Sequence, residues 1–427
     1  MTVHVVGAGL AGLAAAIDAA GRGRTVRIYE AAGQAGGRCR SFFDATLGCT
    51  IDNGNHLLLS GNRSAMAFVD AIDARDELID PGRAAFPFVD LADGRRWTLS
   101  PGAGAIPFWV LHRGRRVPET GAADYLALAR LAFAGGDATV DAVVPPGHPL
   151  HRRLVAPLAV AALNARTDEG AAALLAPVLR ETFLRGGDAC RPLVVRRGLD
   201  AALVAPALRW LAGRGIVPRF NARLRDMRFD DGRVARLRFT DGEVAVAPGD
   251  AVVLAVPPPV AADLVPGLVV PEGARAIVNA HFRLDDRPMP MGAPAFLGIV
   301  GGTAEWLFVR GDVLSVTVSA ADAIADRAAD DLAAAIWADV ARALDVPGAM
   351  PRARVVKEKR ATFAQTPDQL ARRPPAWTGW PNLFLAGDWT ATGLPATIEG
   401  AVRSGFRAAA LACGIENARD RRGPAAA

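Results

Sequence analysis

The sequence predicts an α/β protein in which a Rossmann-type nucleotide-binding domain is interleaved with an α+β domain. Three observations predict this class. The chain begins with an apolar strand pattern, a glycine-rich turn and an alanine-rich helix, its middle alternates like antiparallel strands, and a second glycine-rich segment stands near its end. With 427 residues, 51% of them hydrophobic, the chain is long enough for two domains.

The first thirty residues contain the clearest motif. Residues 3–6 and 25–29 are predicted to form buried strands around a helix that ends near residue 20. The turn between the first strand and the helix is a GxGxxG motif (Gly7, Ala8, Gly9, Leu10, Ala11 and Gly12). Its first glycine permits a tight turn, the second lets the backbone approach a pyrophosphate, and the third lets helix and strand pack closely. Glu30 ends the second strand, where a carboxylate can accept the hydroxyls of an adenosine ribose.

A second glycine motif follows in "EAAGQAGGRCRS", where Gly36, Gly37 and Arg38 come shortly after Glu30 and its neighbour Ala31. Two glycines allow a close backbone approach, and an arginine supplies charge-assisted hydrogen bonds to phosphate. This arrangement resembles the second phosphate-contact motif of the FAD-dependent amine oxidase and phytoene desaturase superfamily. The resemblance implies that FAD is the cofactor. Because residues 383–405 contain no cysteine, we expect it to be bound non-covalently.

The segment "LFLAGDWTATGLPATIEGAVRSG", residues 383–405, has its counterpart in the same superfamily. There the end of the chain returns to the nucleotide domain and places a helix N-terminus against the flavin. The resemblance implies that Gly387 and Asp388 approach the ribityl chain and that the N–H groups of Ala396, Thr397 and Ile398 face the pyrimidine end of the flavin. The helix dipole would then favour negative charge on the reduced ring.

The middle of the chain fits a split arrangement. Residues 215–243 alternate like a meander with Asp-Gly turns at 231–232 and 241–242, and "GDAVVLAVPPP" is predicted to be a buried strand stopped by prolines. By resemblance, backbone near Leu224 lies against the adenine. We expect residues 1–75, 190–268 and 352–420 to form the FAD-binding domain, residues 76–189 and 269–351 the substrate domain, and residues 421–427 a flexible tail.

The motifs also distinguish branches of the superfamily. Amine oxidases usually use an aromatic cage and a lysine near the flavin, whereas this chain has two tyrosines, and its two lysines stand close together at 357 and 359. By contrast, "IDNGNHLLLSGN", "PLAVAALNA", "EWLFVR" and "KEKRATFAQTP" resemble the hydroxysqualene dehydroxylases of hopanoid biosynthesis, although Asn55 stands where a glutamine is expected. The resemblance implies reductive removal of a hydroxyl group from hydroxysqualene. A carotenoid-type desaturase, an amine oxidase-like flavoenzyme and a lipid-binding flavoprotein without turnover are the alternatives.

Candidate catalytic residues come from the same resemblance. The segment with Asn53, Gly54 and Asn55 is expected beside the flavin. His56 follows as the ionisable group of an otherwise apolar stretch, so it is a candidate acid or positioning partner of the acid. A hydrogen-bonded structural histidine is the equal alternative. Asp52 is a second candidate, and it could equally orient the loop. Trp306 and Phe308 could line a channel for a polyisoprenoid chain or pack a core. His281 is expected to be a core residue.

Composition limits the other functions. The net charge of +5 comes without a compact Lys/Arg run, so nucleic acid is not an expected partner, and four cysteines without CxxC spacing indicate neither a metal site nor a disulfide framework. No signal peptide or membrane span is expected. In "IPFWVLHRGRR", Phe108 and Trp109 stand beside arginines, which suits peripheral contact with a membrane from the cytoplasmic side. A buried helix edge with ordinary surface charge is the alternative. The electron donor to the flavin is not indicated.

Overall fold

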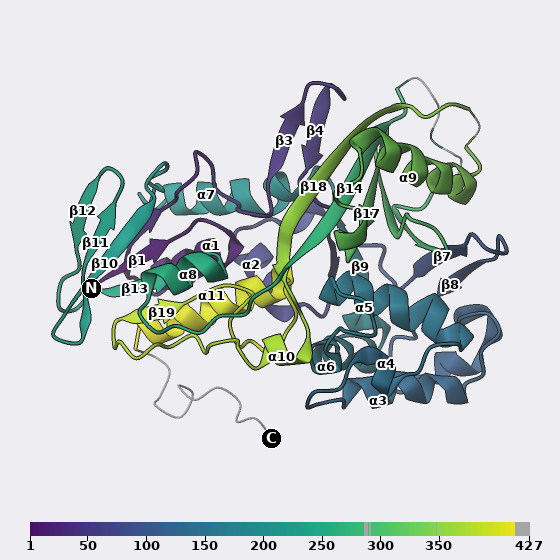
Figure 1. The fold of residues 1–427 in the computed structure, drawn as a ribbon, viewed down its shortest axis with the longest axis horizontal. Coiled ribbons are helices and arrows are strands. Elements are labelled where there is room, and N and C mark those ends of the chain that lie inside the picture. Colours follow the sequence, from purple (N-terminus) through teal and green to yellow (C-terminus); the bar gives the residue numbers. More distant parts are fainter. Residues whose placement is uncertain (286–288, 290–291, 347, 415–427) are drawn as a thin grey trace.

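A parallel four-stranded sheet forms the centre of the nucleotide-binding region (Figure 1). The computed structural model describes residues 1–285, 289, 292–346 and 348–414, so the predicted tail lies outside the described residues. The strand order is β19–β13–β1–β2, with β1 (Thr2–Val6), β2 (Thr25–Tyr29), β13 (Ala251–Leu254) and β19 (Leu383–Leu385). The predicted strands in residues 3–6, 25–29 and 251–254 are confirmed. This sheet thus contains strands from both the N-terminal segment and the returning segment.

Two helices that begin at glycine-rich segments pack side by side on this sheet. They are α1 (Leu10–Gly21) and α11 (Ile398–Ala412). A Cβ atom on Gly405 of α11 would lie 2.2 Å from the carbonyl oxygen of Ala11, so only glycine permits this close approach. The surrounding helices are α2 (Arg63–Ala71), α7 (Ala205–Ala212), which continues a π-helical turn (Asp200–Val204), and α8 (Pro258–Leu264).

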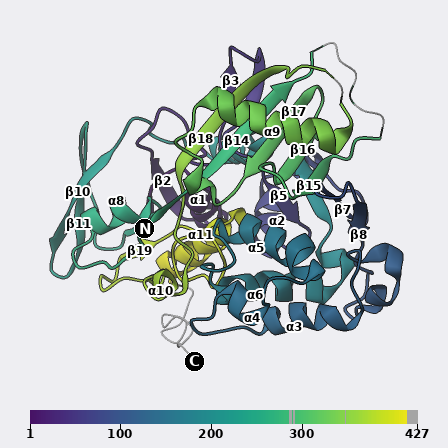
Figure 2. The ribbon, with the colours of Figure 1, turned by 45° about the vertical axis from the view of Figure 1, so that its right-hand side comes forward.

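A seven-stranded sheet dominates the second region. Its order is β18–β14–β17–β16–β15–β7–β8, with β7 (Phe86–Asp90), β8 (Arg96–Leu99), β14 (Ala274–Arg283), β15 (Phe296–Val300), β16 (Trp306–Arg310), β17 (Val313–Val318) and β18 (Arg352–Phe363). Helix α9 (Ala329–Leu344) packs on one face through an aliphatic core. The other face packs against α3 (Leu126–Ala132), α4 (Val140–Val143), α5 (Ala156–Leu163) and α6 (Ala172–Glu181), which Figure 2 shows as a separate helical layer.

Three small sheets complete the described fold. The predicted meander is confirmed as β10 (Leu224–Asp230), β11 (Arg233–Phe239) and β12 (Gly242–Ala245), and its first turn uses Asp231 and Gly232 at positive φ. A hairpin joins β3 (Ser41–Asp44) to β4 (Cys49–Asp52). The third sheet, β5–β9–β6, comprises β5 (Leu57–Leu59), β6 (Leu78–Ile79) and β9 (Pro192–Val195). The remaining short helix before the returning segment is α10 (Pro367–Leu370).

Strand β18 connects the two regions. The sequence-based boundary at 351/352 assigns it to the nucleotide-binding domain, whereas in the structure it pairs with β14 along the edge of the seven-stranded sheet. Its last residues reach the second glycine motif, because the carbonyl of Ala361 accepts a hydrogen bond from Arg38. No helix in the described part of the chain combines the length and the apolar character that a membrane span requires.

Candidate functional site

The first glycine loop has the geometry of a dinucleotide cradle. Gly7 has φ +105°, and a Cβ atom on Gly12 would lie 1.9 Å from the Gly7 carbonyl oxygen, so both positions require glycine for packing within the protein. Gly9 differs, because no described protein atom other than those of Gly9 and its two chain neighbours lies within 4 Å of the position a Cβ would take there. The space beside Gly9 is therefore open to a ligand. Leu10, Ala11 and Gly12 form the first turn of α1, whose unpaired N–H groups favour an anion.

Glu30 is held at the edge of the same loop. Its carboxylate accepts the N–H groups of Ala8 at 2.7 Å and of Ala32 at 2.8 Å, while Ala31 is exposed. Gly36 lies on the other side of the loop, and its N–H donates to the carbonyl of Ala8 at 2.8 Å. The two glycine motifs therefore form one continuous backbone surface around Gly9.

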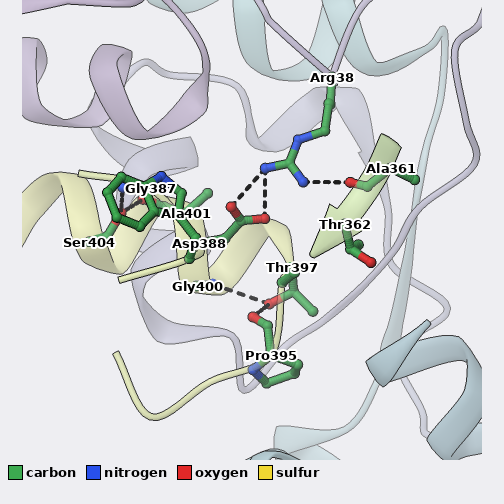
Figure 3. A network of polar contacts seen from close by, with 12 residues as sticks. Arg38, Ala361, Thr362, Gly387, Asp388, Pro395, Thr397, Gly400, Ala401 and Ser404 are labelled. Atoms are coloured by element: carbon green, nitrogen blue, oxygen red, sulfur yellow. Dashed lines mark hydrogen bonds and ion pairs between the residues drawn. The ribbon is translucent and has the colours of Figure 1, made fainter. Parts of the chain in front are cut away.

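Arg38 extends toward the returning segment (Figure 3). Its Nη2 lies 2.7 Å from both carboxylate oxygens of Asp388, and its Nη1 donates to the carbonyl of Ala361 at 2.6 Å. The Asp388 carboxylate raises the pKa of Arg38, so the guanidinium stays charged. The sequence assigned these two residues to phosphate and ribityl contacts separately. The structure joins them into one charged pair at the junction of three chain segments.

A buried arginine shapes the returning segment. Arg373 donates to the carbonyl oxygens of Asp388, Thr390 and Leu394 at 2.8, 2.6 and 2.8 Å, respectively. Burial lowers its pKa to about 10, so it remains protonated at neutral pH. Gly387 is fixed separately by its N–H, which donates to Ser404 Oγ at 2.8 Å (Figure 3).

The start of α11 only partly matches the prediction. The N–H group of Ala396 donates to Gln365 Oε1 at 2.7 Å, and that of Thr397 donates to the carbonyl of Pro395 at 2.8 Å. Two of the three N–H groups that were predicted to face a ligand are therefore bonded within the protein. The prediction remains for the N–H group of Ile398, the first residue of the helix. Glu399 caps a different helix, because its carboxylate accepts the N–H groups at the start of α2.

The segment between β4 and β5 lies between the two regions. Asn53 Nδ2 approaches the carbonyl of Arg38 and the carboxylate of Glu358, both at 3.4 Å. The backbone of Gly54 lies against Asn279 of β14, since an added Cβ would be 3.4 Å from the Asn279 amide nitrogen. Asn55 Nδ2 donates to Thr317 Oγ1 at 3.1 Å. The three predicted residues thus contact both the GGR motif and the seven-stranded sheet.

His56 and Asp52 have different surroundings. Burial lowers the pKa of His56 to about 4, so its imidazole is neutral at pH 7. Asp52 is 1% exposed, and its carboxylate accepts hydrogen bonds from Ser41 Oγ, the Leu199 N–H and Arg310 Nη1. These three donors come from three other segments of the described chain, and such a fixed, buried carboxylate favours the orienting role over a catalytic one.

The predicted aromatic residues occupy the sheet face that packs against the helical layer. Trp306 lies edge-on to Phe88, with ring centroids 5.5 Å apart, and Phe296 lies between Trp306 and Phe308. Phe308 is buried, whereas Trp306 is partly accessible. His281 is a fully buried strand residue hydrogen-bonded to Ser315 Oγ, as expected.

One predicted residue is misplaced. Trp109 was expected to point outward to a membrane, but it is 6% exposed and packs edge-on to Tyr125, with centroids 5.1 Å apart. The expectation was wrong because residues 108–111 form a 3-10 turn that directs this one indole into the helical core. Phe108, in contrast, is 65% exposed.

Leu224, the residue expected near adenine, begins β10 and packs in the core that contains Tyr29.

Sequence reasoning missed residues that act only through tertiary contacts. Arg373 and Gln365 organise the returning segment, and Asn279 and Thr317 contact the segment after β4. Gln365 stands in the quoted motif "KEKRATFAQTP", which could have drawn attention to it. Nothing in local spacing indicates the other three.

The arrangement fits an FAD. A Gly9 position open to a ligand, a helix N-terminus, and a carboxylate at the end of β2 suit the adenosine diphosphate part. The Arg38–Asp388 pair and the first turn of α11 lie further along the same surface, where a ribityl chain and a flavin ring would follow. The residues therefore provide the polar contacts that such a cofactor requires.

Comparison with known proteins agrees with this geometry. The sequence model of the family "Flavin containing amine oxidoreductase" matches residues 10–413. A hydroxysqualene dehydroxylase of Sinorhizobium fredii is 51% identical over 97% of this chain and 99% of its own length, and one of Rhodopseudomonas palustris is 50% identical over 96% and 98%. Among solved structures, the cyclohexylamine oxidase of Brevibacterium oxydans superposes with a TM-score of 0.70 at 16% identity, covering 97% of this chain and 99% of that one. The last likeness shows the fold alone.

Proposed function

The chain belongs to the flavin containing amine oxidoreductase family and, within it, to the hydroxysqualene dehydroxylases, and on this premise we propose that it reductively converts hydroxysqualene to squalene in hopanoid biosynthesis. The observation that carries the proposal is identity of about half of all residues over nearly the full length of both relatives. The alternative of a carotenoid-type desaturase would use the same fold in the oxidative direction.

The reaction replaces a hydroxyl group with hydrogen. When bound, reduced FAD supplies a hydride to the allylic carbon. The hydroxyl oxygen must take up one proton and leave as water, so one C–O bond breaks and one C–H bond forms. The chain has to hold the alcohol, keep bulk water away from the developing cation, and deliver the proton.

We assign His56 a positioning role. With a pKa of about 4, only about one molecule in a thousand carries a protonated His56 at pH 7, which makes the free enzyme a poor proton donor at this residue. A neutral imidazole can still hold a hydroxyl or a water by a hydrogen bond. Asp52 does not contact the substrate in this proposal. Its hydrogen bonds to Ser41 and Arg310 hold the end of β4, from which the segment that contains His56 continues.

The substrate is insoluble in water, so the protein needs contact with a membrane to reach it. Five large apolar side chains within residues 106–133 are exposed: Ile106, Phe108, Leu111, Leu126 and Phe133. Leu126 and Phe133 are seven residues apart on and just after α3, so they share one face with Arg130. Neither Arg113 nor Arg130 pairs with a carboxylate in the described part of the chain. We call the surface formed by these five apolar side chains with Arg113 and Arg130 the α3 surface. We propose that the α3 surface rests on an anionic bilayer.

Product analysis tests the proposed activity. FAD-loaded protein is photoreduced without oxygen and mixed with hydroxysqualene in detergent, and products are identified by mass. We expect squalene and concurrent reoxidation of the flavin. His56→Ala should keep its FAD and slow the reaction by about a hundredfold, because the hydroxyl group loses a partner that orients it.

Two results would contradict the proposal. One is reoxidation of the flavin without loss of oxygen from the alcohol. The other is desaturation of a phytoene-like polyene by the oxidised enzyme together with inertness toward hydroxysqualene, which would favour the desaturase alternative.

A further inference from the structure

A string of three polar side chains crosses the aromatic face of the seven-stranded sheet. Asn279 of β14 and Thr317 of β17 are opposite each other in the strand register, and Thr317 is also opposite Trp306 of β16. Asn55 reaches the same point from the segment between β4 and β5. A polar patch thus borders the aromatic residues Trp306, Phe88 and Phe296.

Hydrogen bonds fix the orientation of every group in this string. Asn279 Nδ2 donates to the carbonyl of Asn53 at 3.1 Å, which leaves Asn279 Oδ1 as an acceptor. Thr317 Oγ1 donates its single proton to this oxygen at 2.7 Å and can then only accept from Asn55. Asn55 must therefore present Nδ2 to Thr317, at 3.1 Å. One backbone carbonyl determines the direction of the whole string.

The free end of the string is the Asn55 Oδ1 acceptor. Asn279 is 1% and Thr317 9% exposed, so both are buried groups whose hydrogen bonds are satisfied within the string. Asn55 is partly accessible, and within the described residues no donor contacts its Oδ1. The string therefore holds an oriented acceptor in place next to His56 and beside an aromatic wall.

We propose that Asn55 Oδ1 accepts the hydrogen bond of the substrate's hydroxyl group and that Thr317 and Asn279 are positioning residues which hold it there. This inference rests on the proposed function and adds the alcohol subsite to it. The substrate O–H donates to Asn55, so the lone pairs of the hydroxyl oxygen stay available for the proton that converts it to water. Asn55 contacts the substrate, whereas the other two residues act through it.

The subsite makes a prediction about specificity. When a hydrocarbon occupies the same space, the Asn55 acceptor loses water without gaining a donor, which costs free energy. An alcohol avoids this cost. Hydroxysqualene should therefore bind more tightly than its product squalene, and this difference should depend on the string.

Ligand titrations of the FAD-loaded oxidised protein test the inference. Binding of hydroxysqualene and of squalene, both in detergent, is followed by the change in the flavin absorption spectrum. We expect Thr317→Val and Asn55→Leu to weaken alcohol binding by about tenfold. Neither variant should weaken squalene binding, and Asn55→Leu should tighten it, because the acceptor that squalene leaves unpaired is gone. Thr317→Ser retains the hydroxyl group and should bind like the parent. In turnover, both weakened variants should show a raised KM for the alcohol.

The matched control is Ser315→Ala. Ser315 lies two residues from Thr317 on the same strand face but bonds to His281, so its loss should not change the preference for the alcohol. Flavin content and melting temperature show whether each variant is folded. The subsite is refuted if Thr317→Val and Asn55→Leu both keep the parent's preference, or if alcohol and squalene weaken equally. If the parent itself neither prefers nor converts the alcohol, the proposed function fails and the subsite with it.

Discussion

The glycines of the first loop differ in what surrounds them. Gly7 and Gly12 face protein atoms at distances where no side chain fits, whereas Gly9 faces open space and has φ −73°, a value that any residue adopts. The fold thus requires two of the glycines, whereas the third leaves open space in which we expect a ligand. Substitution can separate these effects.

We predict that Gly9→Val lowers FAD affinity by at least about tenfold without lowering the melting temperature of the apoprotein. The valine side chain fits the protein and would fill the open space where we expect the pyrophosphate to bind. Gly12→Ala is the matched contrast, since its Cβ would overlap the Gly7 carbonyl and destabilise the apoprotein by about 1–3 kcal/mol or more. Flavin fluorescence titration and thermal unfolding measure the two effects. Equal losses of apoprotein stability in both variants would contradict the assignment.

A second prediction at this scale concerns Glu305, at the turn before β16. Burial raises the pKa of Glu305 to about 7 from an ordinary value of 4.5, although its carboxylate accepts a hydrogen bond from the Ser319 N–H at 2.7 Å. Between pH 4.5 and 7 the folded protein therefore binds more protons at this group than the unfolded chain. This proton uptake stabilises the fold at low pH, and the contribution is lost as pH rises through 7.

Replacing Glu305 with glutamine should remove this dependence. The parent should lose about 2–3 kcal/mol of unfolding free energy relative to Glu305→Gln between pH 5 and pH 8. Urea unfolding at the two pH values measures the difference, and other titrating groups cancel in the comparison. Parallel pH dependence in both proteins would show that the carboxyl group is not held in a low-dielectric site.

At the scale of elements, helix α3 has one face in the protein core and one face exposed to solvent. Its buried side chains Leu128, Leu131 and Ala132 pack into the helical core, and its other face exposes Leu126 and, just past its end, Phe133, which is 76% exposed. Trp109 packs on Tyr125 at the start of this helix and so fixes residues 108–111 beside it. Packing of one aromatic residue thus orients the exposed apolar side chains of its neighbours.

The α3 surface can be tested with exposed residues alone. Phe108→Ser combined with Phe133→Ser should weaken binding to anionic vesicles and slow turnover of vesicle-borne substrate by about tenfold, because buried apolar area at the bilayer is lost. Activity in detergent and flavin content should remain. Salt should weaken the binding of the parent, since the arginine contribution is screened.

The control for the α3 surface removes apolar side chains of similar exposure elsewhere. Phe43 is 67% and Val217 72% exposed, and both lie outside residues 106–133. Phe43→Ser combined with Val217→Ser should bind vesicles like the parent. If both double variants behave alike, the lipid-facing surface lies elsewhere on the molecule.

At the scale of the whole molecule, Gln365 connects the two regions. It is fully buried, and its side chain donates to the carbonyl of Leu163 at the end of α5 and accepts the N–H of Ala396 before α11. Its own carbonyl accepts the N–H of Ala171 at the start of α6. One side chain therefore fixes the helical layer relative to the start of α11.

We predict that Gln365→Leu destabilises the protein by about 2–4 kcal/mol, because two buried backbone groups lose their partner. FAD affinity should fall as well, since Ala396 leads directly into α11. Chemical unfolding with and without FAD separates the two effects. An unchanged FAD affinity despite lower stability would limit Gln365 to a role in the fold.

The sequence by itself determined the strand, turn and helix of the nucleotide cradle, the meander, and the family. These features depend on residues close in sequence, where glycine spacing, apolar periodicity and turn residues act through local sterics. Contacts between distant segments needed the tertiary structure. In these contacts Arg38 pairs with Asp388, and the Ala396 N–H donates to Gln365. Trp109 packs in the core against Tyr125, and Asn55, Thr317 and Asn279 form one hydrogen-bonded string. Packing determines these partners, because a buried polar group bonds to an atom that the fold places within hydrogen-bond distance. The spacing of two residues along the chain does not predict how far apart they lie in space.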